Sequence, residues 1–199
     1  SLPISLSHLI PVATELGFVF HNCLEDEITL IHKSEMVEFV PFIPTHTLGA
    51  GALITNEHNQ VLMIKEHGMT GYKLPGGHIE LGEGIEESVV RETLEETGIE
   101  ATFVSVVGMA TRHPYQFGKS NLYFICHLIA QTQEIAIQDT DEIAEAKWID
   151  VEEYINNPDS YPFNRQLVAS LIGKQGLELT QLEGNYGPVH KPEIFFSKN

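Results

Sequence analysis

Residues 76–99 read GGHIELGEGIEESVVRETLEETGI, a stretch that opens on two glycines and then fills with glutamate. Apolar residues recur every three or four positions over residues 85–97, which predicts an amphipathic helix with one side against a core. Gly98 is predicted to end this helix in a left-handed conformation. The apolar stripe consists of Ile85, Val89 and Val90, and Thr93 continues it.

Glutamates gather on the opposite side of the same predicted helix. Glu92, Glu95 and Glu96 are helical neighbours, and like charges at that spacing destabilise a helix by roughly a few tenths of a kcal/mol per pair. Glu95 and Glu96 also fall in the last turn, where the helix dipole disfavours anions by about 0.3–1 kcal/mol each. This placement is locally unfavourable, so we expect a positive partner.

That partner is expected to include a metal ion. Arg91 is spaced to pair with Glu87 and Glu95, but one guanidinium cannot neutralise the whole cluster. Oxygen donors without Cys or paired His favour Mg²⁺ or Mn²⁺ over Zn²⁺. The alternative is a solvated acidic helix face, which would make the spacing, the glycines and the last-turn carboxylates coincidental.

The spacing of these residues resembles the Nudix box, in which a glycine is followed by five residues, a glutamate, seven residues and the pattern Arg-Glu-aliphatic-any-Glu-Glu-any-Gly-aliphatic. Thr93 departs from that pattern, because an aliphatic residue is usual there. The resemblance implies an α/β/α sandwich and an enzyme that hydrolyses a diphosphate bond by in-line attack of water on phosphorus. The matching residues are Gly77, Glu83, Arg91, Glu92, Glu95, Glu96, Gly98 and Ile99.

The resemblance also implies roles for individual residues. Glu95 and Glu96 match metal ligands, and the carbonyl of Gly76 matches a backbone ligand. Glu92 matches a position that binds metal or serves as the base in different members. Arg91 matches the arginine that orients the glutamates. The implied cofactor is Mg²⁺ or Mn²⁺.

Further carboxylates are candidates for the same site. Glu83 precedes the helix, and its negative charge also suits the positive N-terminal end of the helix dipole. Its role can therefore be either helix stabilisation or metal binding. Family members often recruit a carboxylate from a later loop, and this chain offers Asp139, Asp141 and Glu142. We choose Glu142 among them as the catalytic candidate.

A loop outside the box mixes a cation with aromatic residues. Residues 112–117 read RHPYQF between two predicted strands. A nucleotide base can stack on such rings and a phosphate can meet a guanidinium, so Arg112 and Tyr115 are candidate substrate contacts. The alternative is an ordinary loop.

Two outlying segments narrow the resemblance. Residues 17–22, GFVFHN, and 117–124, FGKSNLYF, resemble segments of the Nudix subgroup that contains the antisense fibroblast growth factor protein and plant ADP-ribose/NADH diphosphatases. Asn121 stands where that subgroup often has Asp, and the acidic turn at residues 25–27 also differs. The leading hypothesis is a Mg²⁺-dependent diphosphatase acting on a nucleoside diphosphate derivative such as ADP-ribose or NADH. The alternatives are a nucleoside triphosphate or capped-RNA substrate, and a non-catalytic nucleotide-binding regulator that retains the fold.

The length and composition of the chain limit its domain count, its location and its partners. The 199 residues, 42% of them hydrophobic, suffice for one domain plus an adjunct. No apolar run approaches a membrane span and no signal peptide is recognisable, so we expect a globular, cytoplasmic protein. A net charge of −17 argues against duplex nucleic acid as a partner.

Cys23 and Cys126 lack metal or redox spacing, and we expect buried, reduced thiols. The family resemblance implies a homodimer.

The part of the chain before the box domain differs from the rest. Residues 1–45 are predicted to form an N-terminal extension, with a helix over 7–16 and a hairpin of strands over 17–21 and 28–32. An extended connector is expected at 41–44, because proline disfavours helix in the residue before it.

The domain itself is predicted over residues 46–175, with a C-terminal tail over 176–199. Strands at 47–55 and 61–65 are expected to pair across a turn at 56–59. The pattern is α+β, a mixed sheet with helices on both faces. Further strands are expected at 102–109, 121–130 and 146–149, helices at 151–156 and 164–174, and an edge strand at 193–196.

Overall fold

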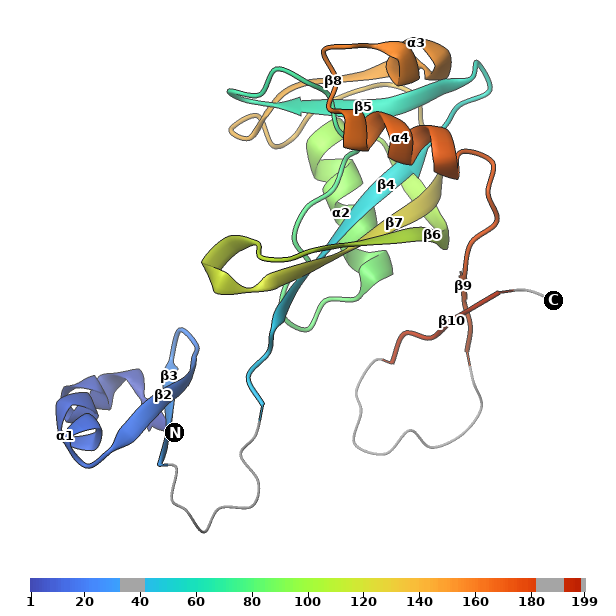
Figure 1. Ribbon diagram of the computed structural model, residues 1–199. Coiled ribbons are helices and arrows are strands. Elements are labelled where there is room, and N and C mark those ends of the chain that lie inside the picture. Colours follow the sequence, from blue (N-terminus) through green and yellow to red (C-terminus); the bar gives the residue numbers. More distant parts are fainter. Residues whose placement is uncertain (33–41, 182–191, 198–199) are drawn as a thin grey trace. The chain divides into compact units, whose positions relative to one another are not determined.

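The computed structural model describes residues 1–32, 42–181 and 192–197. The chain divides into two compact units, Ser1–Thr45 and His46–Asn199 (Figure 1). The connector expected at 41–44 begins outside the described residues. Within the described part of the chain, no helix is long and apolar enough to cross a membrane.

The N-terminal unit contains the predicted helix and hairpin. A 3-10 helix (η1, Ile4–Leu9) leads into α1 (Ile10–Glu15), which has Pro11 in its first turn. Gly17, at φ +84°, then turns the chain into the hairpin. Three strands pair antiparallel in the order β1-β3-β2, namely β1 (Leu2–Pro3), β2 (Phe18–Cys23) and β3 (Glu27–His32).

This unit buries few side chains. Among its described residues, Ile28 alone is buried. Cys23 is exposed, which corrects the expectation that both cysteines are buried. The reason is that Cys23 ends β2, an edge strand of a three-stranded sheet, whereas Cys126 lies in a core strand of the other unit. Both thiols are free, as predicted.

Five longer strands build the second unit. β4 pairs parallel with β7, and β7 pairs antiparallel with β6, whereas β5 and β8 form a separate antiparallel pair. A short 3-10 helix (η2, Gln116–Gly118) lies in the connection from β6 to β7. The strands are β4 (His46–Ile54), β5 (Gln60–Glu66), β6 (Ala101–Arg112), β7 (Ser120–Ala130) and β8 (Ile143–Asp150).

The predicted pairing of β4 with β5 is wrong apart from one bridge between Thr55 and Val61. The glycine-rich loop before the box helix takes its place. The carbonyls of Pro75 and Gly77 accept hydrogen bonds from N–H groups of β4 at 2.8 and 3.0 Å. Lys73, earlier in this loop, exchanges two backbone hydrogen bonds of 2.9 Å with β5. The loop therefore lies between the two strands and is held by both.

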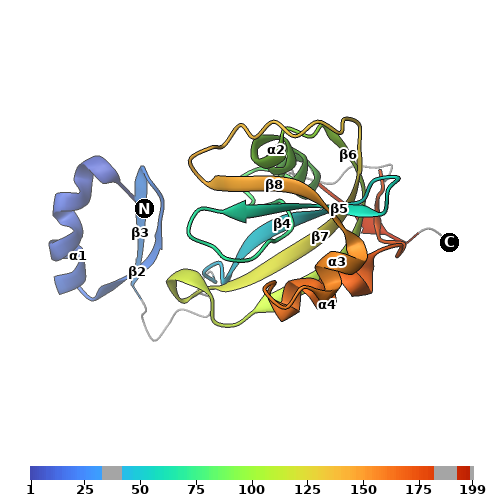
Figure 2. The ribbon, with the colours of Figure 1, turned by 90° about the horizontal axis from the view of Figure 1, so that it is seen from above.

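The box helix, α2 (Ile85–Thr97), covers one face of the strands, and α3 (Val151–Asn156) and α4 (Pro162–Leu171) lie on the other side (Figure 2). Neighbouring residues of β4 pack against the helices on opposite faces of the strands. Ala52 packs in a core cluster with α2, and Leu53 packs in a second cluster with α3 and α4. The unit is an α/β/α sandwich, as predicted, and the predicted bounds of α2 and α3 are confirmed.

Two short strands lie near the C-terminal end. β9 (Glu178–Leu179) pairs antiparallel with β10 (Phe195–Phe196), which is the strand expected at 193–196. The Phe195 ring lies 6.0 Å from the Phe103 ring of β6, centroid to centroid. The end of the chain is thereby packed on the same core cluster as α2.

Candidate functional site

Both ends of α2 lie where its sequence predicts. Glu87 Oε2 accepts a hydrogen bond of 3.3 Å from Gly84 N–H ahead of the first turn, and Gly98 follows the last turn at φ +75°. The acidic side, however, is not a solvated face. Glu96 is only 3% exposed and Glu92 is partly buried, because the glycine-rich loop covers this side of the helix.

Two glycines allow the loop to come so close. Gly76 N–H donates to Glu96 Oε2 at 2.6 Å, and its φ of +136° is rarely adopted by residues with a side chain. A Cβ on Gly76 would clash with the Ala50 carbonyl oxygen of β4. A Cβ on Gly77 would lie 2.7 Å from Glu92 Oε1. A larger residue at Gly76 would push the loop away from β4, whereas one at Gly77 would displace the Glu92 carboxylate.

Arg91 joins the remaining box carboxylates. Its Nε lies 2.8 Å from Glu83 Oε1, and its Nη1 lies 2.9 Å from Glu95 Oε2. Its Nη2 lies 3.1 Å from Glu92 Oε1. The hydrogen bond from the guanidinium lowers the pKa of Glu83, and the same bond raises the pKa of Arg91. The predicted pairing with Glu95 is confirmed, and Glu83 is fixed beside the helix by the arginine.

Burial favours the protonated form of the two inner carboxylates. It raises the pKa of Glu96 to about 8, against the opposing effects of the Lys73 charge and the Gly76 N–H. Burial also raises the pKa of Glu92. The charge of Glu142 adds to both shifts. A cation placed beside these groups would favour their ionised forms at neutral pH.

The donor set fits a hard divalent cation in its chemistry. It offers only oxygen atoms, from carboxylates and the Gly76 carbonyl, which are the ligands that Mg²⁺ and Mn²⁺ prefer. Among the described residues, no three His, Cys, Asp or Glu side chains are grouped so as to hold a metal ion as they stand. Arg91 engages Glu83, Glu92 and Glu95.

Glu142 lies directly before β8. Its carboxylate is exposed, and it lines a small groove together with Glu66, His67, Asp139 and Asp141. Its charge raises the pKa values of both inner box carboxylates, and its backbone carbonyl accepts a hydrogen bond of 2.9 Å from His67 N–H, directly after β5. Glu142 N–H donates to Asp139 Oδ1 at 3.1 Å, which ties the loop together.

A cavity of about 910 Å³ opens beside the glycine-rich loop. Gly76 and Gly77 line it, as do both predicted substrate contacts, Arg112 and Tyr115. This volume is that of a site for a small organic molecule. The structure therefore brings together two features that lie far apart in the sequence, the box loop and the loop between β6 and β7.

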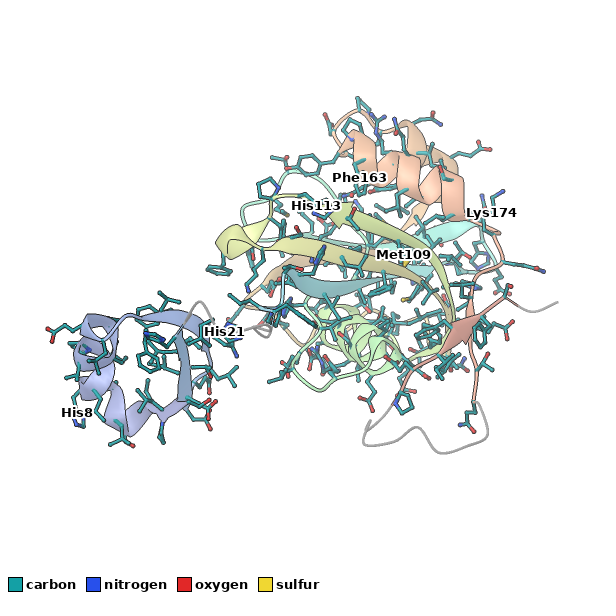
Figure 3. The ribbon with its side chains drawn as sticks, turned by 60° about the horizontal axis from the view of Figure 1, so that its bottom comes forward. His8, His21, Met109, His113, Phe163 and Lys174 are labelled. Carbon is teal, nitrogen blue, oxygen red and sulfur yellow. The ribbon has the colours of Figure 1, made fainter. Side chains whose placement is uncertain are left out.

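The aromatic lining from α4 was missed by sequence reasoning. Tyr161 and Phe163 both line the cavity. The Arg112 guanidinium lies 5.5 Å from the centroid of the Phe163 ring, and Figure 3 labels Phe163 on α4 and His113, the residue after Arg112. No local pattern could reveal this, because α4 reaches the end of β6 only through the tertiary fold.

Lys73 was also missed. It lines the cavity, forms an ion pair with Glu66, and is the cation whose charge opposes the raised pKa of Glu96. Its position three residues before Gly76 was the available signal.

Glu193 is another residue of the site that the sequence did not predict. Its carboxylate accepts hydrogen bonds from Ile85 N–H at 2.7 Å and from Glu86 N–H at 3.2 Å. It therefore caps the first turn of α2, where the helix dipole favours an anion. Only the fold brings the end of the chain to the box helix.

Comparisons with known proteins agree with this geometry. A family model described as NUDIX domain matches residues 45–171. Nucleoside diphosphate-linked moiety X motif 6 of Xenopus laevis is 32% identical over 206 residues, a match that covers 96% of this chain and 91% of the relative. Nudix hydrolase 8 of Arabidopsis thaliana is 35% identical over 164 residues, which are 79% of this chain. The chain spans only 44%, 54% and 58% of the length of the plant relatives Nudix hydrolase 8, 5 and 2.

Solved structures share the fold. A crystal structure of a MutT NUDIX hydrolase from Burkholderia pseudomallei superposes with a TM-score of 0.54 at 20% identity, covering 64% of this chain and 98% of that chain. The crystal structure of a UDP-X diphosphatase superposes with a TM-score of 0.53 at 19% identity, covering 69% of this chain and 68% of that chain. At such identities the likeness concerns the fold alone.

Proposed function

Because the chain belongs to the Nudix hydrolase family, we propose that it is a divalent-metal-dependent hydrolase that cleaves the diphosphate linkage of a nucleoside diphosphate derivative, with ADP-ribose and NADH as the first candidates. One observation carries the proposal. The buried carboxylate of Glu96 lies against Gly76 N–H, and Gly76 also lines the cavity that is large enough for such a substrate. The box and the substrate cavity therefore meet at this glycine.

The proposed metal ligands are the box carboxylates and one carbonyl. Glu92, Glu95, Glu96 and the Gly76 carbonyl would hold Mg²⁺ or Mn²⁺, with Glu83 beside them. A bound divalent cation there would neutralise phosphate oxygens and lower the pKa of a water molecule. Arg91 contacts one oxygen of each of Glu92 and Glu95, at 3.1 and 2.9 Å, and the second oxygen of each carboxylate is the one proposed to bind the cation.

The chain's own groups then orient the reaction. Glu92 and Glu142 are the carboxylates proposed to hold or orient the attacking water. Arg91 positions Glu92 and Glu95, and Lys73 and Arg112 offer positive charge along the cavity to the two phosphates. The water oxygen forms a bond to one phosphorus while the bridging P–O bond breaks. The products are two phosphate monoesters, and a proton is released.

A substrate panel tests this function. With Mg²⁺, we expect ADP-ribose to give AMP and ribose 5-phosphate, and NADH to give AMP and a second mononucleotide. Glu96→Gln is expected to lower kcat by at least about a hundredfold, because it removes a charge from the electrostatic site. Glu100→Gln, an exposed carboxylate just beyond the helix, is the matched control and should leave kcat unchanged.

The same panel separates the alternatives. If the chain hydrolyses nucleoside triphosphates or capped RNA and leaves ADP-ribose and NADH intact, its substrate is a nucleoside triphosphate or a capped RNA. If every compound stays intact while one of them raises the melting temperature, the chain is a nucleotide-binding regulator and the proposed hydrolase is overturned.

The partner proposed for the whole chain is a second copy of itself. The N-terminal unit supports this, because side chains such as Leu16 and Phe20 stay largely exposed on it. Its own described residues supply too little buried apolar surface for a stable core. The net charge of −17 argues against duplex nucleic acid as the other partner, and a small nucleotide is the partner proposed in its place.

A further inference from the structure

Glu193, in the C-terminal segment 192–197, contacts the first turn of the box helix. Its carboxylate oxygens accept hydrogen bonds from Ile85 N–H at 2.7 Å and from Glu86 N–H at 3.2 Å. The approach is close, because a Cβ on Gly84 would lie 2.8 Å from the carboxylate carbon of Glu193. Gly84 has a φ of −85°, which any residue can adopt. Its missing side chain therefore matters here because it makes room for Glu193.

The segment that carries Glu193 is itself bound to the sheet. The Ile194 carbonyl accepts a hydrogen bond of 2.7 Å from Thr180 N–H, and β10 pairs with β9. Leu177, directly before β9, exchanges two backbone hydrogen bonds with Val106 of β6, at 2.8 and 2.9 Å. Phe195 packs on the core cluster to which α2 contributes. The carboxylate therefore reaches α2 from a backbone that pairing and packing hold in place.

Glu83 lies two residues before Ile85, and its hydrogen bond is the largest cause of the raised pKa of Arg91. Arg91 Nε–H donates to Glu83 Oε1 at 2.8 Å, and Nη2–H donates to Oε2 at 3.1 Å. Because two such bonds fix the plane of a guanidinium, the position of Glu83 orients Arg91. Arg91 in turn contacts Glu92 and Glu95, two of the proposed metal ligands. Movement of the first turn of α2 would therefore reach the metal ligands through Arg91.

We propose that Glu193 is a positioning residue of the box, which keeps Glu83 paired with Arg91 by holding the first turn of α2. The box is then completed by a residue 108 positions after Ile85 in the sequence. The inference rests on the proposed function for its consequence, which is that loss of Glu193 weakens the binding of the divalent cation. Glu193 needs no contact with the cation or the substrate for this role.

Asp150 allows this role to be separated from that of an ordinary helix cap. Its Oδ1 accepts hydrogen bonds from Glu152 N–H at 2.9 Å and from Glu153 N–H at 3.0 Å, in the first turn of α3. α3 and α2 lie on opposite sides of the strands (Figure 2). The carboxylates of Asp150 and Glu193 thus make the same kind of contact, but that of Asp150 is remote from the box. Asp150→Ala is therefore the matched control for Glu193→Ala.

Side-chain NMR of the ¹⁵N-labelled full chain tests the pairing of Arg91 without any metal. The chain has three arginines, so the Nε–H signal of Arg91 can be assigned by substitution. Glu193→Ala should speed the hydrogen exchange of Arg91 Nε–H about fivefold, the factor that corresponds to the loss of one helix cap. Asp150→Ala should leave this exchange at the wild-type rate. Circular dichroism checks that each variant is folded.

Electron paramagnetic resonance of added Mn²⁺ measures the consequence for the metal ligands. Glu193→Ala should bind Mn²⁺ roughly threefold or more weakly than the wild type, because residues that orient metal ligands contribute to affinity. Asp150→Ala should bind it as the wild type does.

The positioning role is overturned if Glu193→Ala leaves the exchange of Arg91 Nε–H unchanged, or if Asp150→Ala speeds it equally. It is also overturned if the wild type and Glu193→Ala bind Mn²⁺ with the same affinity, and the proposed function then stands. A wild-type chain that binds no Mn²⁺ would lose the proposed function, and the exchange of Arg91 Nε–H would still decide whether Glu193 positions Arg91.

Discussion

Arg91 is a single guanidinium that contacts three carboxylates, on Glu83, Glu92 and Glu95. Its fork of N–H donors lets it do so from one turn of α2. The charge of the box is therefore balanced locally by one residue that the sequence already marked. What the sequence could not reveal is the burial of Glu96, because the loop that covers it is placed by β4 and β5.

Arg91→Gln should destabilise the fold. The change leaves three carboxylates without their shared cation, and we expect the free energy of unfolding to fall by about 1–3 kcal/mol, since breaking a partly buried ion pair leaves uncompensated charge. Urea denaturation at neutral pH measures it. Lys174→Gln, which removes an exposed lysine just beyond α4, is the control, and equal stability of the Arg91 variant and the wild type would contradict the account.

Glu145 makes stability depend on pH at a second, surface cluster. Hydrogen bonds from the Tyr72 hydroxyl and the Lys65 ammonium lower the pKa of Glu145 to about 2 in the folded chain. A carboxylate with a lowered folded pKa contributes stability above its unfolded pKa and loses it as the pH falls through the folded value. Glu145→Gln should therefore be less stable than the wild type at pH 7, with a difference that shrinks as the pH falls from about 4.5 toward 2.

Urea denaturation of the wild type and Glu145→Gln across that pH window measures the difference. Glu100→Gln serves as the control, and its free energy of unfolding should follow that of the wild type at each pH. A constant gap between the wild type and Glu145→Gln at all pH values would refute the assignment.

At the scale of elements, α2 was predictable with its bounds because its apolar stripe, its glycine cap and its box spacing all lie within one local segment. The pairing of β4 with β5 was not, because a loop that follows both strands in sequence takes the edge of β4. The aromatic residues that line the cavity from the start of α4, and the Glu193 cap on α2, could not be predicted for the same reason. Local pattern predicts elements, whereas contacts between distant segments require the fold.

Glu193 is expected to hold the first turn of α2. Glu193→Ala removes the acceptor of two backbone N–H groups, on Ile85 and Glu86, and should cost about 1 kcal/mol of unfolding free energy. Hydrogen exchange should be faster at those two amides, with little change at the C-terminal end of the helix. Ser197→Ala, on the same segment but exposed, is the control. Unchanged exchange at Ile85 and Glu86 would show that the cap is not formed.

At the scale of the whole molecule, the two units differ in how much they bury. The second unit has two core clusters, one on each face of its strands, whereas Ile28 alone is buried among the described residues of the first. Composition predicted one domain with an adjunct, and it could not indicate how exposed the adjunct's apolar side chains are. We therefore expect another surface to cover the first unit.

Light scattering coupled to gel filtration tests the proposed homodimer. A mass near twice the 22.2 kDa of one chain is expected, and Leu16→Asp or Phe20→Asp should shift it toward a single chain. Leu81→Asp, an exposed leucine of the second unit, is the control that should leave the mass unchanged. A wild-type mass of one chain would exclude the dimer.

The proposed hydrolysis depends on the binding of a divalent cation by Glu92, Glu95, Glu96 and the Gly76 loop. Electron paramagnetic resonance of added Mn²⁺ tests it most directly, because the signal of the free aqueous ion falls when the ion binds protein. We predict that the wild type and Glu100→Gln both deplete the free signal, that Mg²⁺ restores it by competition, and that Glu96→Gln binds at least about tenfold more weakly. Equal binding by Glu96→Gln and the wild type, or none by either, would contradict the account.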